Sequence, residues 1–174
     1  LPHVPGHEFA GVISEIGGAV TKFKVGDRVT VPFVCGCGKC QYCLRGDAQV
    51  CPTQTQPGFT GFGSFAEYVA IDNADFNLIH IPAEVSFATA AALGCRFATS
   101  YRGLIKRAKV KSGETVAIFG CGGVGLSAIM IAKAHGASVY AIDINDDALE
   151  IAASLGAQTI NSKNTDPVAF LQNI

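Results

Sequence analysis

Four cysteines lie close together in the first third of the chain and have the spacing of a metal site. They read C-x₂-C-x₂-C-x₇-C, at Cys37, Cys40, Cys43 and Cys51. Thiolates at such short intervals can converge on one ion, and four of them complete the tetrahedral coordination of a closed zinc site. Because no coordination position stays open, we expect this zinc to be structural and to stabilise residues 35–51. A redox-active disulfide pair and an iron–sulfur cluster are the alternatives.

A second set of metal-ligating residue types is spread widely over the chain. His7 and Glu8 lie in the segment PGHEFAG, and Cys95 lies in LGCRFATSY. One histidine and one cysteine are ligands of the kind that an open zinc site uses, with three protein ligands plus water or substrate. Each also has an ordinary structural interpretation, because a single cysteine often behaves as a small buried apolar residue. We interpret Cys35, two residues before the cysteine cluster, as a spare cysteine.

Three glycines further along the chain have the spacing of a dinucleotide-binding turn. Gly120, Gly122 and Gly125 read G-x-G-x-x-G, between the apolar runs Val116–Phe119 and Val124–Ala134. The first glycine permits a tight turn, the second lets the backbone approach a pyrophosphate, and the third lets helix and strand pack closely. The N-terminus of the following helix would offer free N–H groups to the phosphates. An ordinary strand–turn–helix connection without a ligand is the alternative.

The next apolar run, Ser138–Ile142, ends on a carboxylate that distinguishes between cofactors. Asp143 follows the last glycine of the turn by roughly 20 residues, the spacing expected for an acid that binds the ribose hydroxyls. A carboxylate there accepts a hydrogen bond from the 2′-OH of NAD and repels a 2′-phosphate. Ile144 and Asn145 supply no arginine, so the sequence favours NAD over NADP.

The elements that must position these residues change in type along the chain. The first part is β-rich, and from Ser86 onward helical and strand patterns alternate, which indicates a domain boundary near residues 90–100. We expect a partial β-rich domain over residues 1–95. Over residues 96–174 we expect the first half of an α/β Rossmann domain, incomplete at its C-terminal end. The predicted elements are strands at Phe9–Ile16, Val25–Val31, Ser64–Ile71, Asn77–Ile81, Val116–Phe119, Ser138–Ile142 and near Gln158–Ile160, and helices at Ala88–Leu93, Phe97–Lys109 and Val124–Ala134.

Composition excludes several classes of partner. The chain has 174 residues, is 49% hydrophobic and carries a net charge of −1. It can therefore bury a core, and it has no basic run that would suggest nucleic acid or an anionic membrane as partner. No apolar stretch is long enough to span a bilayer, and no signal peptide is evident. Seven cysteines, four of them at metal-site spacing, favour a reducing compartment, so we expect a cytoplasmic protein.

Several motifs in order make the sequence resemble the zinc-dependent alcohol dehydrogenases of the medium-chain dehydrogenase/reductase superfamily. The resemblance covers the whole chain. It is carried by GHEFAG at 6–11 with the GDRV turn at 26–29, the four cysteines at 37, 40, 43 and 51, LGCRFATSY at 93–101, and GCGGVG at 120–125. The resemblance implies a GroES-like catalytic domain with a structural zinc lobe at 35–51, followed by a Rossmann NAD-binding domain.

The resemblance also implies roles for individual residues. His7 and Cys95 would be ligands of a catalytic zinc. Glu8 would either contact these ligands without binding the metal or bind the metal intermittently, and so help to exchange water for substrate. Thr99 would lie near the nicotinamide, and Gly123 and Val124 would meet the pyrophosphate. The implied reaction is reversible hydride transfer between an alcohol and NAD, in a homo-oligomer that is a dimer or a tetramer at full length.

Two departures from the family pattern bear on activity. The family's other catalytic-zinc cysteine and the hydroxyl residue of its proton relay precede the histidine. Here only six residues precede His7, and none of them is cysteine. We do not interpret His3 as a replacement. We read both ends of the chain as cuts through a longer protein, and we expect these 174 residues alone to have little or no activity.

Two other functions stay open at this stage. The chain could belong to a zinc- and NAD-binding protein without catalytic activity, although an intact His7 and Cys95 argue against that. Within the same family, polyol, formaldehyde and threonine dehydrogenases are close relatives. The sequence does not separate them, because the segments that would line the substrate pocket are absent.

Overall fold

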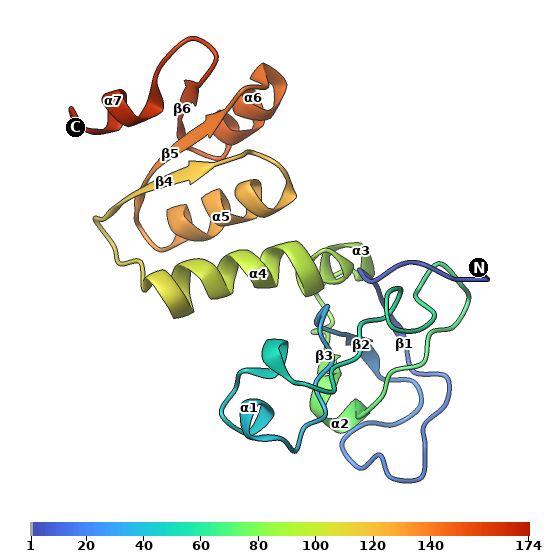
Figure 1. Ribbon diagram of the computed structural model, residues 1–174. Coiled ribbons are helices and arrows are strands. Elements are labelled where there is room, and N and C mark those ends of the chain that lie inside the picture. Colours follow the sequence, from blue (N-terminus) through green and yellow to red (C-terminus); the bar gives the residue numbers. More distant parts are fainter. Residues whose placement is uncertain (1) are drawn as a thin grey trace. The chain divides into compact units, whose positions relative to one another are not determined.

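The computed structural model describes residues 2–174, which divide into two compact units (Figure 1). The first unit ends at Cys95 and the second begins at Arg96. That the first unit carries the catalytic groups and the second binds the cofactor stays a prediction from the sequence. No helix in residues 2–174 is both long and apolar enough to cross a membrane.

The first unit is built on a small antiparallel sheet. Its strands are β1 (Ala10–Val12), β2 (Arg28–Thr30) and β3 (Ile79–His80), and β2 lies between the other two. All three lie inside predicted strands but are shorter than predicted. Short helices complete the unit, namely α1 (Gln41–Leu44), the 3₁₀ helix η1 (Ala48–Val50), α2 (Ala74–Asn77) and α3 (Phe87–Ala91). Three of the buried apolar side chains, Ile13, Val31 and Ile81, lie just beyond the ends of the strands.

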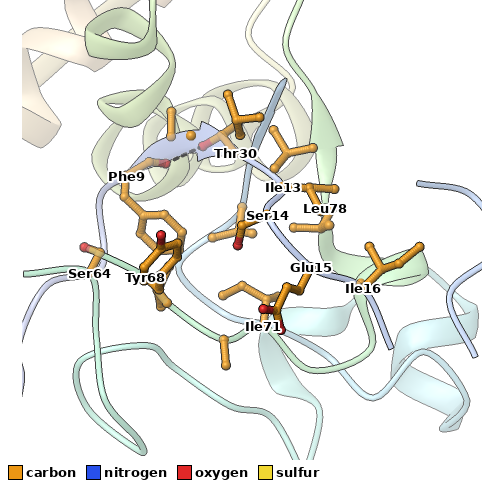
Figure 2. A pocket seen from close by; sticks show the side chains of 18 of the residues that line it. Phe9, Ile13, Ser14, Glu15, Ile16, Thr30, Ser64, Tyr68, Ile71 and Leu78 are labelled. Carbon is orange, nitrogen blue, oxygen red and sulfur yellow. Dashed lines mark hydrogen bonds between the residues drawn. The ribbon is translucent and has the colours of Figure 1, made fainter. Parts of the chain in front are cut away.

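The predicted strand at Ser64–Ile71 is wrong. Its first residues are held by a neighbouring loop, because the N–H groups of Ser64 and Phe65 donate to the carbonyls of Gly6 and Pro5, both at 3.0 Å. The rest of the segment has no ladder partner, because a cavity of about 450 Å³ lies between it and the β1 region. Figure 2 shows side chains of both segments around this cavity. A strand needs a partner at hydrogen-bonding distance, and none is present here among residues 2–174.

The predicted helix at Phe97–Lys109 forms, although much of it is wound more widely than an α-helix. From Leu93 onward the chain forms π-helical η2 (Leu93–Phe97), α4 (Ala98–Tyr101) and π-helical η3 (Arg102–Ala108). Lys109 ends the run with a φ of +57°. Short π-helical segments are rare and are found frequently at functional sites.

The second unit contains a parallel three-stranded sheet. The strands β4 (Thr115–Phe119), β5 (Ser138–Asp143) and β6 (Gln158–Asn161) follow one another in sequence order and are joined by the helices α5 (Gly123–Ala134) and α6 (Asp146–Ser154), with α7 (Pro167–Leu171) at the end. Small side chains with no exposure, such as Ala132, Ala141 and Ala152, let the helices pack closely on the sheet. The predicted βαβαβ arrangement, the first half of a Rossmann fold, is confirmed.

Candidate active site

The glycine-rich turn between β4 and α5 has the backbone that its spacing predicts. Gly120 has a φ of +91°, a region that costs glycine little and other residues much. A Cβ on Gly125 would collide with the carbonyl oxygen of Gly120, so only glycine lets α5 begin this close to the strand. Gly122 is the N-cap of α5, and a Cβ built on it meets nothing within 4 Å. The turn therefore leaves open space in front of the uncapped first N–H groups of the helix.

Asp143 closes this turn from the end of β5. One carboxylate oxygen accepts the N–H of Cys121 at 2.6 Å, and the other accepts the N–H groups of Ile144 at 2.6 Å and Asn145 at 2.9 Å. These donors, with Cys121 the strongest, hold the pKa of Asp143 below its usual range. The group is therefore ionised at neutral pH. A carboxylate has about four lone-pair sites, so acceptor capacity is left for a ligand hydroxyl.

Arg96 lies beside the start of α5, and sequence reasoning passed over it. A Cβ built on Gly123 would be 2.9 Å from Cδ and 3.1 Å from Nη1 of Arg96. The exposed guanidinium thus adds a full positive charge to the partial charge of the helix N-terminus. The sequence offered one indication of a role for Arg96, namely that it is a basic residue directly after the predicted zinc ligand Cys95. Thr99, predicted to lie near a nicotinamide, is exposed on α4.

The buried hydroxyl of Ser100 fixes α4 to the same turn. Its single O–H lies within hydrogen-bond distance of two backbone carbonyls, that of Val124 at 2.7 Å and that of Arg96 at 2.9 Å. Ser100 is 5% exposed. This one side chain therefore holds together the segment that carries Arg96 and Thr99 and the first turn of α5.

The four cysteines of the lobe converge as their spacing predicts. All four Sγ atoms lie within 4.8 Å of one another, with Cys37–Cys43 at 4.0 Å and Cys40–Cys51 at 3.8 Å. A tetrahedral zinc with Zn–S bonds of about 2.3 Å places its sulfurs about 3.8 Å apart, so the set fits this ion. A disulfide needs about 2.05 Å between sulfurs, and a cluster needs room between the thiolates for further atoms. The geometry therefore favours zinc over both alternatives.

The local fold explains this convergence. Cys40 is the N-cap of α1, and its Sγ accepts the N–H of Cys43 at 3.5 Å. Backbone N–H groups of Lys39 and Cys40 lower the pKa of Cys37 to about 6, which favours the thiolate that a metal needs. Cys35 stays outside the group of four. It is buried, its Sγ lies 3.7 Å from the carbonyl of Pro32, and burial raises its pKa to about 11.

His7, Glu8 and Cys95 form the second group. Their ligand atoms all lie within 4.8 Å of one another, although 87 positions separate Glu8 from Cys95. The His7 ring is packed edge-on against Phe33 at 4.9 Å and Phe59 at 5.3 Å, between ring centroids. Cys95 is presented by η2. Three half-buried ligand atoms of these types can hold one zinc and leave a position for an exchangeable ligand.

Close backbone packing brings the His7 segment to this place. A Cβ on Gly58 would be 2.6 Å from the carbonyl oxygen of Gly6, and a Cβ on Gly63 would be 2.6 Å from Cα of Gly58. These three glycines form a crossing, the glycine crossing, directly before His7. The Cys95 side is fixed by the Phe33 N–H, which donates to the carbonyl of Gly94 at 2.9 Å. His3 takes no part in the group, because its Nε2 hydrogen-bonds the carbonyl of Gly58 at 2.8 Å.

Comparison with known proteins matches both parts of the chain. A family model described as "Alcohol dehydrogenase GroES-like domain" matches residues 1–83, and one described as "Zinc-binding dehydrogenase" matches residues 123–174. An alcohol dehydrogenase of Geobacillus stearothermophilus is 43% identical over 99% of this chain and 51% of its own length. One from a Moraxella species is 44% identical over 98% and 50%. The chain thus spans about half the length of the curated relatives that it matches.

Solved structures agree with these matches. An alcohol dehydrogenase from a Thermus species superposes with a TM-score of 0.94 at 34% identity, over 99% of this chain and 51% of that one. A structure described as an NAD-dependent alcohol dehydrogenase gives 0.88 at 35% identity, over 99% and 50%. Since the likeness in sequence and in fold runs over almost the whole chain, the chain belongs to the zinc-dependent alcohol dehydrogenases of the medium-chain dehydrogenase/reductase superfamily.

Proposed function

We propose that the full-length protein is a zinc-dependent oxidoreductase that transfers hydride reversibly between an alcohol and NAD. The observation that carries this proposal is the group His7, Glu8 and Cys95, whose ligand atoms lie within 4.8 Å of one another. Ligands from such distant segments are costly to bring together, and the histidine–thiolate pair with one carboxylate suits an open zinc site. The alcohol dehydrogenases at 43% and 44% identity support the substrate class.

Bound zinc supplies Lewis-acid chemistry to an alcohol or carbonyl oxygen, and bound NAD accepts or returns the hydride. The chain's own residues prepare the place for both. Phe33 and Phe59 fix the ring plane of His7, and η2 fixes Cys95. Glu8 is the third member of the group, and we propose that it binds the metal intermittently while water and substrate exchange.

The second unit would bind the cofactor through its turn. We propose that the pyrophosphate lies in the open space at Gly122, facing the N–H groups of Gly123 and Val124. The Arg96 guanidinium, beside the same turn, would pair with a phosphate oxygen. Asp143, ionised and with acceptor capacity left, would bind the ribose hydroxyls and disfavour a 2′-phosphate. Gly120 and Gly125 would act by shaping the turn, and Thr99 would lie toward the nicotinamide, as the family resemblance implies.

The cysteine lobe would hold a second zinc with a structural role. The sulfur spacing of 3.8–4.0 Å supports this, and four thiolates leave no position for substrate. The family resemblance alone supports a homo-oligomer, and the cysteine-rich composition supports a cytoplasmic location. We propose in addition that the 174-residue chain by itself has little activity, because it spans about half the length of its relatives.

The function is tested with the full-length protein by following reduction of NAD with primary, secondary, aromatic and polyol substrates. Zinc content is measured in parallel. We expect two zinc ions per subunit and turnover of at least one alcohol class. His7→Asn should lose one zinc and nearly all turnover. The matched control His80→Asn, at an exposed ring stacked on Phe23, should keep both.

Other outcomes would assign the protein elsewhere. One zinc per subunit and no turnover of any alcohol would support the binding protein without catalytic activity. Two zinc ions with turnover confined to polyols would place it among the polyol dehydrogenases. One observation supports the polyol dehydrogenase as an alternative: a galactitol-1-phosphate dehydrogenase from Escherichia coli superposes with a TM-score of 0.88 at 32% identity.

A further inference from the structure

The cysteine lobe (residues 35–51) has little regular structure, so its orientation must be fixed from outside. At its base Cys35 and Thr55 exchange two backbone hydrogen bonds, both of 2.9 Å. Within it, α1 and η1 span only four and three residues. Further support comes from α2, more than 20 residues further along the chain.

Asn77, the last residue of α2, grips the backbone at the start of the lobe. Its Oδ1 accepts the N–H of Gly36 at 2.8 Å, and its Nδ2 donates to the carbonyl of Gly36 at 3.0 Å. The second N–H of the same amide faces two backbone carbonyls, that of Asp72 at 2.8 Å and that of Asn73 at 3.3 Å. Asn77 is 3% exposed. A side-chain amide both donates and accepts hydrogen bonds. Asn77 therefore pairs with both the N–H and the carbonyl of Gly36, as the backbone of a neighbouring β-strand would.

The preceding residue, Phe76, leaves no gap between α2 and the lobe. A Cβ built on Gly36 would be 2.9 Å from Cε1 of Phe76 and 2.8 Å from Sγ of Cys43. A Cβ built on Gly38 would be 3.1 Å from Cγ of the same ring. Gly36 is therefore confined between a metal-ligand sulfur and the α2 helix, and any shift of α2 reaches the cysteines directly.

The α2 helix is itself anchored on another segment. The carboxylate of Asp75 accepts the N–H of Thr21 at 2.8 Å, the hydroxyl of Thr21 at 2.7 Å and the N–H of Lys22 at 2.9 Å. These bonds lower the pKa of Asp75, with the Thr21 hydroxyl the strongest cause. The helix is thus fixed to a loop outside the lobe, and it can act as a platform.

We propose that Asn77 is a positioning residue for the zinc of the cysteine lobe. It fixes Gly36, and through it the adjacent Cys37, so that the four thiolates stay converged before the ion binds. The inference rests on the structural zinc of the proposed function. Groups that orient metal ligands typically contribute about 10–100-fold to metal affinity, and we expect an effect in that range.

The test uses full-length protein carrying His7→Asn, so that the lobe holds the remaining zinc. Asn77→Asp is added, because it can still accept the Gly36 N–H but has lost both N–H donors that face the carbonyls of Gly36, Asp72 and Asn73. We expect transfer of zinc to a chromogenic chelator to become about 10–100 times faster. The thiolate-to-cobalt charge-transfer bands of the cobalt-substituted lobe should shift as well. Asn77→Ser, which removes the amide without adding charge, should act in the same direction.

Two controls separate positioning from general loss of stability. Asn164→Asp makes the same chemical change at an exposed site and should leave zinc transfer unchanged. Val31→Ala opens a cavity in the core of the same unit, where Val31 is 2% exposed, and should lower the melting temperature without changing the cobalt bands. Zinc transfer from both Asn77 variants at the unsubstituted rate, or equal acceleration by Val31→Ala, would overturn the inference. Absence of lobe zinc in the His7→Asn protein itself would reject the structural zinc instead.

Discussion

The carboxylate of Asp143 accepts a hydrogen bond of 2.6 Å from the backbone N–H of Cys121, 22 positions earlier in the chain. The acceptor ends β5 and the donor lies between two glycines of the turn. The residue proposed to select NAD therefore also holds the turn that would bind the pyrophosphate. The two roles can be separated experimentally, because selecting NAD requires the cofactor whereas holding the turn does not.

The first prediction concerns acid stability. The pKa of Asp143 in the folded chain is below its usual range, which is about 3.9 in an unfolded chain. The bonds therefore stabilise the fold fully above about pH 3.9, and this contribution is lost as the pH falls through the lower folded pKa. Asp143→Asn should flatten the fall in melting temperature between about pH 5 and pH 2, measured without cofactor. An unchanged acid slope in this variant, with Asp147→Asn as control, would contradict the prediction.

The second prediction contrasts two glycines of the turn. A Cβ on Gly125 collides with the Gly120 carbonyl, whereas a Cβ on Gly122 meets open space. Gly125→Ala should lower the free energy of unfolding by about 1–3 kcal/mol, the usual cost of overpacking. Gly122→Ala should leave the melting temperature nearly unchanged and still weaken NAD binding, because the methyl group would occupy the proposed pyrophosphate space. Calorimetric titration with NAD and thermal melts check both, and tight NAD binding by Gly122→Ala would place the pyrophosphate elsewhere.

The third prediction concerns Arg96. A charge-assisted hydrogen bond contributes about 1.5–3 kcal/mol, so Arg96→Gln should weaken NAD binding by at least about tenfold. Binding of adenosine, which has no phosphate, should be unaffected, and the salt dependence of NAD binding should decrease. Arg107→Gln, at another exposed arginine, is the matched control. Equal losses for NAD and adenosine would show that Arg96 acts on the fold and not on a phosphate.

The fourth prediction follows from removing metal. In the zinc-free chain the pKa of Cys37 is about 6, whereas burial raises that of Cys35 to about 11. At neutral pH Cys37 is therefore largely thiolate, and iodoacetamide should modify it well before Cys35. Its rate should fall as the pH drops through about 6, where the thiolate is protonated. Peptide mapping by mass spectrometry checks the order, and added zinc should protect Cys37 while leaving the slow rate of Cys35 unchanged.

Patterns confined to short stretches predicted their structures well. The apolar runs around Gly120 and Gly136 predicted the βαβ order, because strand and helix periods are local properties. The interval between the lobe cysteines predicted their convergence for the same reason. The pairing of His7 with Cys95 was available only through family resemblance, since no local pattern joins residues 88 positions apart.

Features that depend on distant partners were missed or wrong. The alternation in Ser64–Ile71 describes two faces of a chain but not whether a neighbouring strand exists, and here a cavity lies where a partner would be. Asn77 looked like part of a strand because its own neighbours are apolar. Its role depends on Gly36, 41 positions away. The proposed role of Arg96 likewise depends on a distant residue, because its side chain lies beside Gly123 at the start of α5.

The glycine crossing has a consequence for how this protein can vary. A Cβ on Gly58 or Gly63 would collide with the backbone of Gly6, and a Cβ on Gly6, which has a φ of +107°, would collide with Ser64 and Phe65. In a saturation library of the first unit, selected for metal retention, we expect these three positions to accept no replacement. Other glycines of the unit such as Gly17 and Gly61, where a Cβ meets nothing within 4 Å, should accept many. If these three glycines prove invariant in such a library, the reason would be that their close packing places His7, which directly follows Gly6.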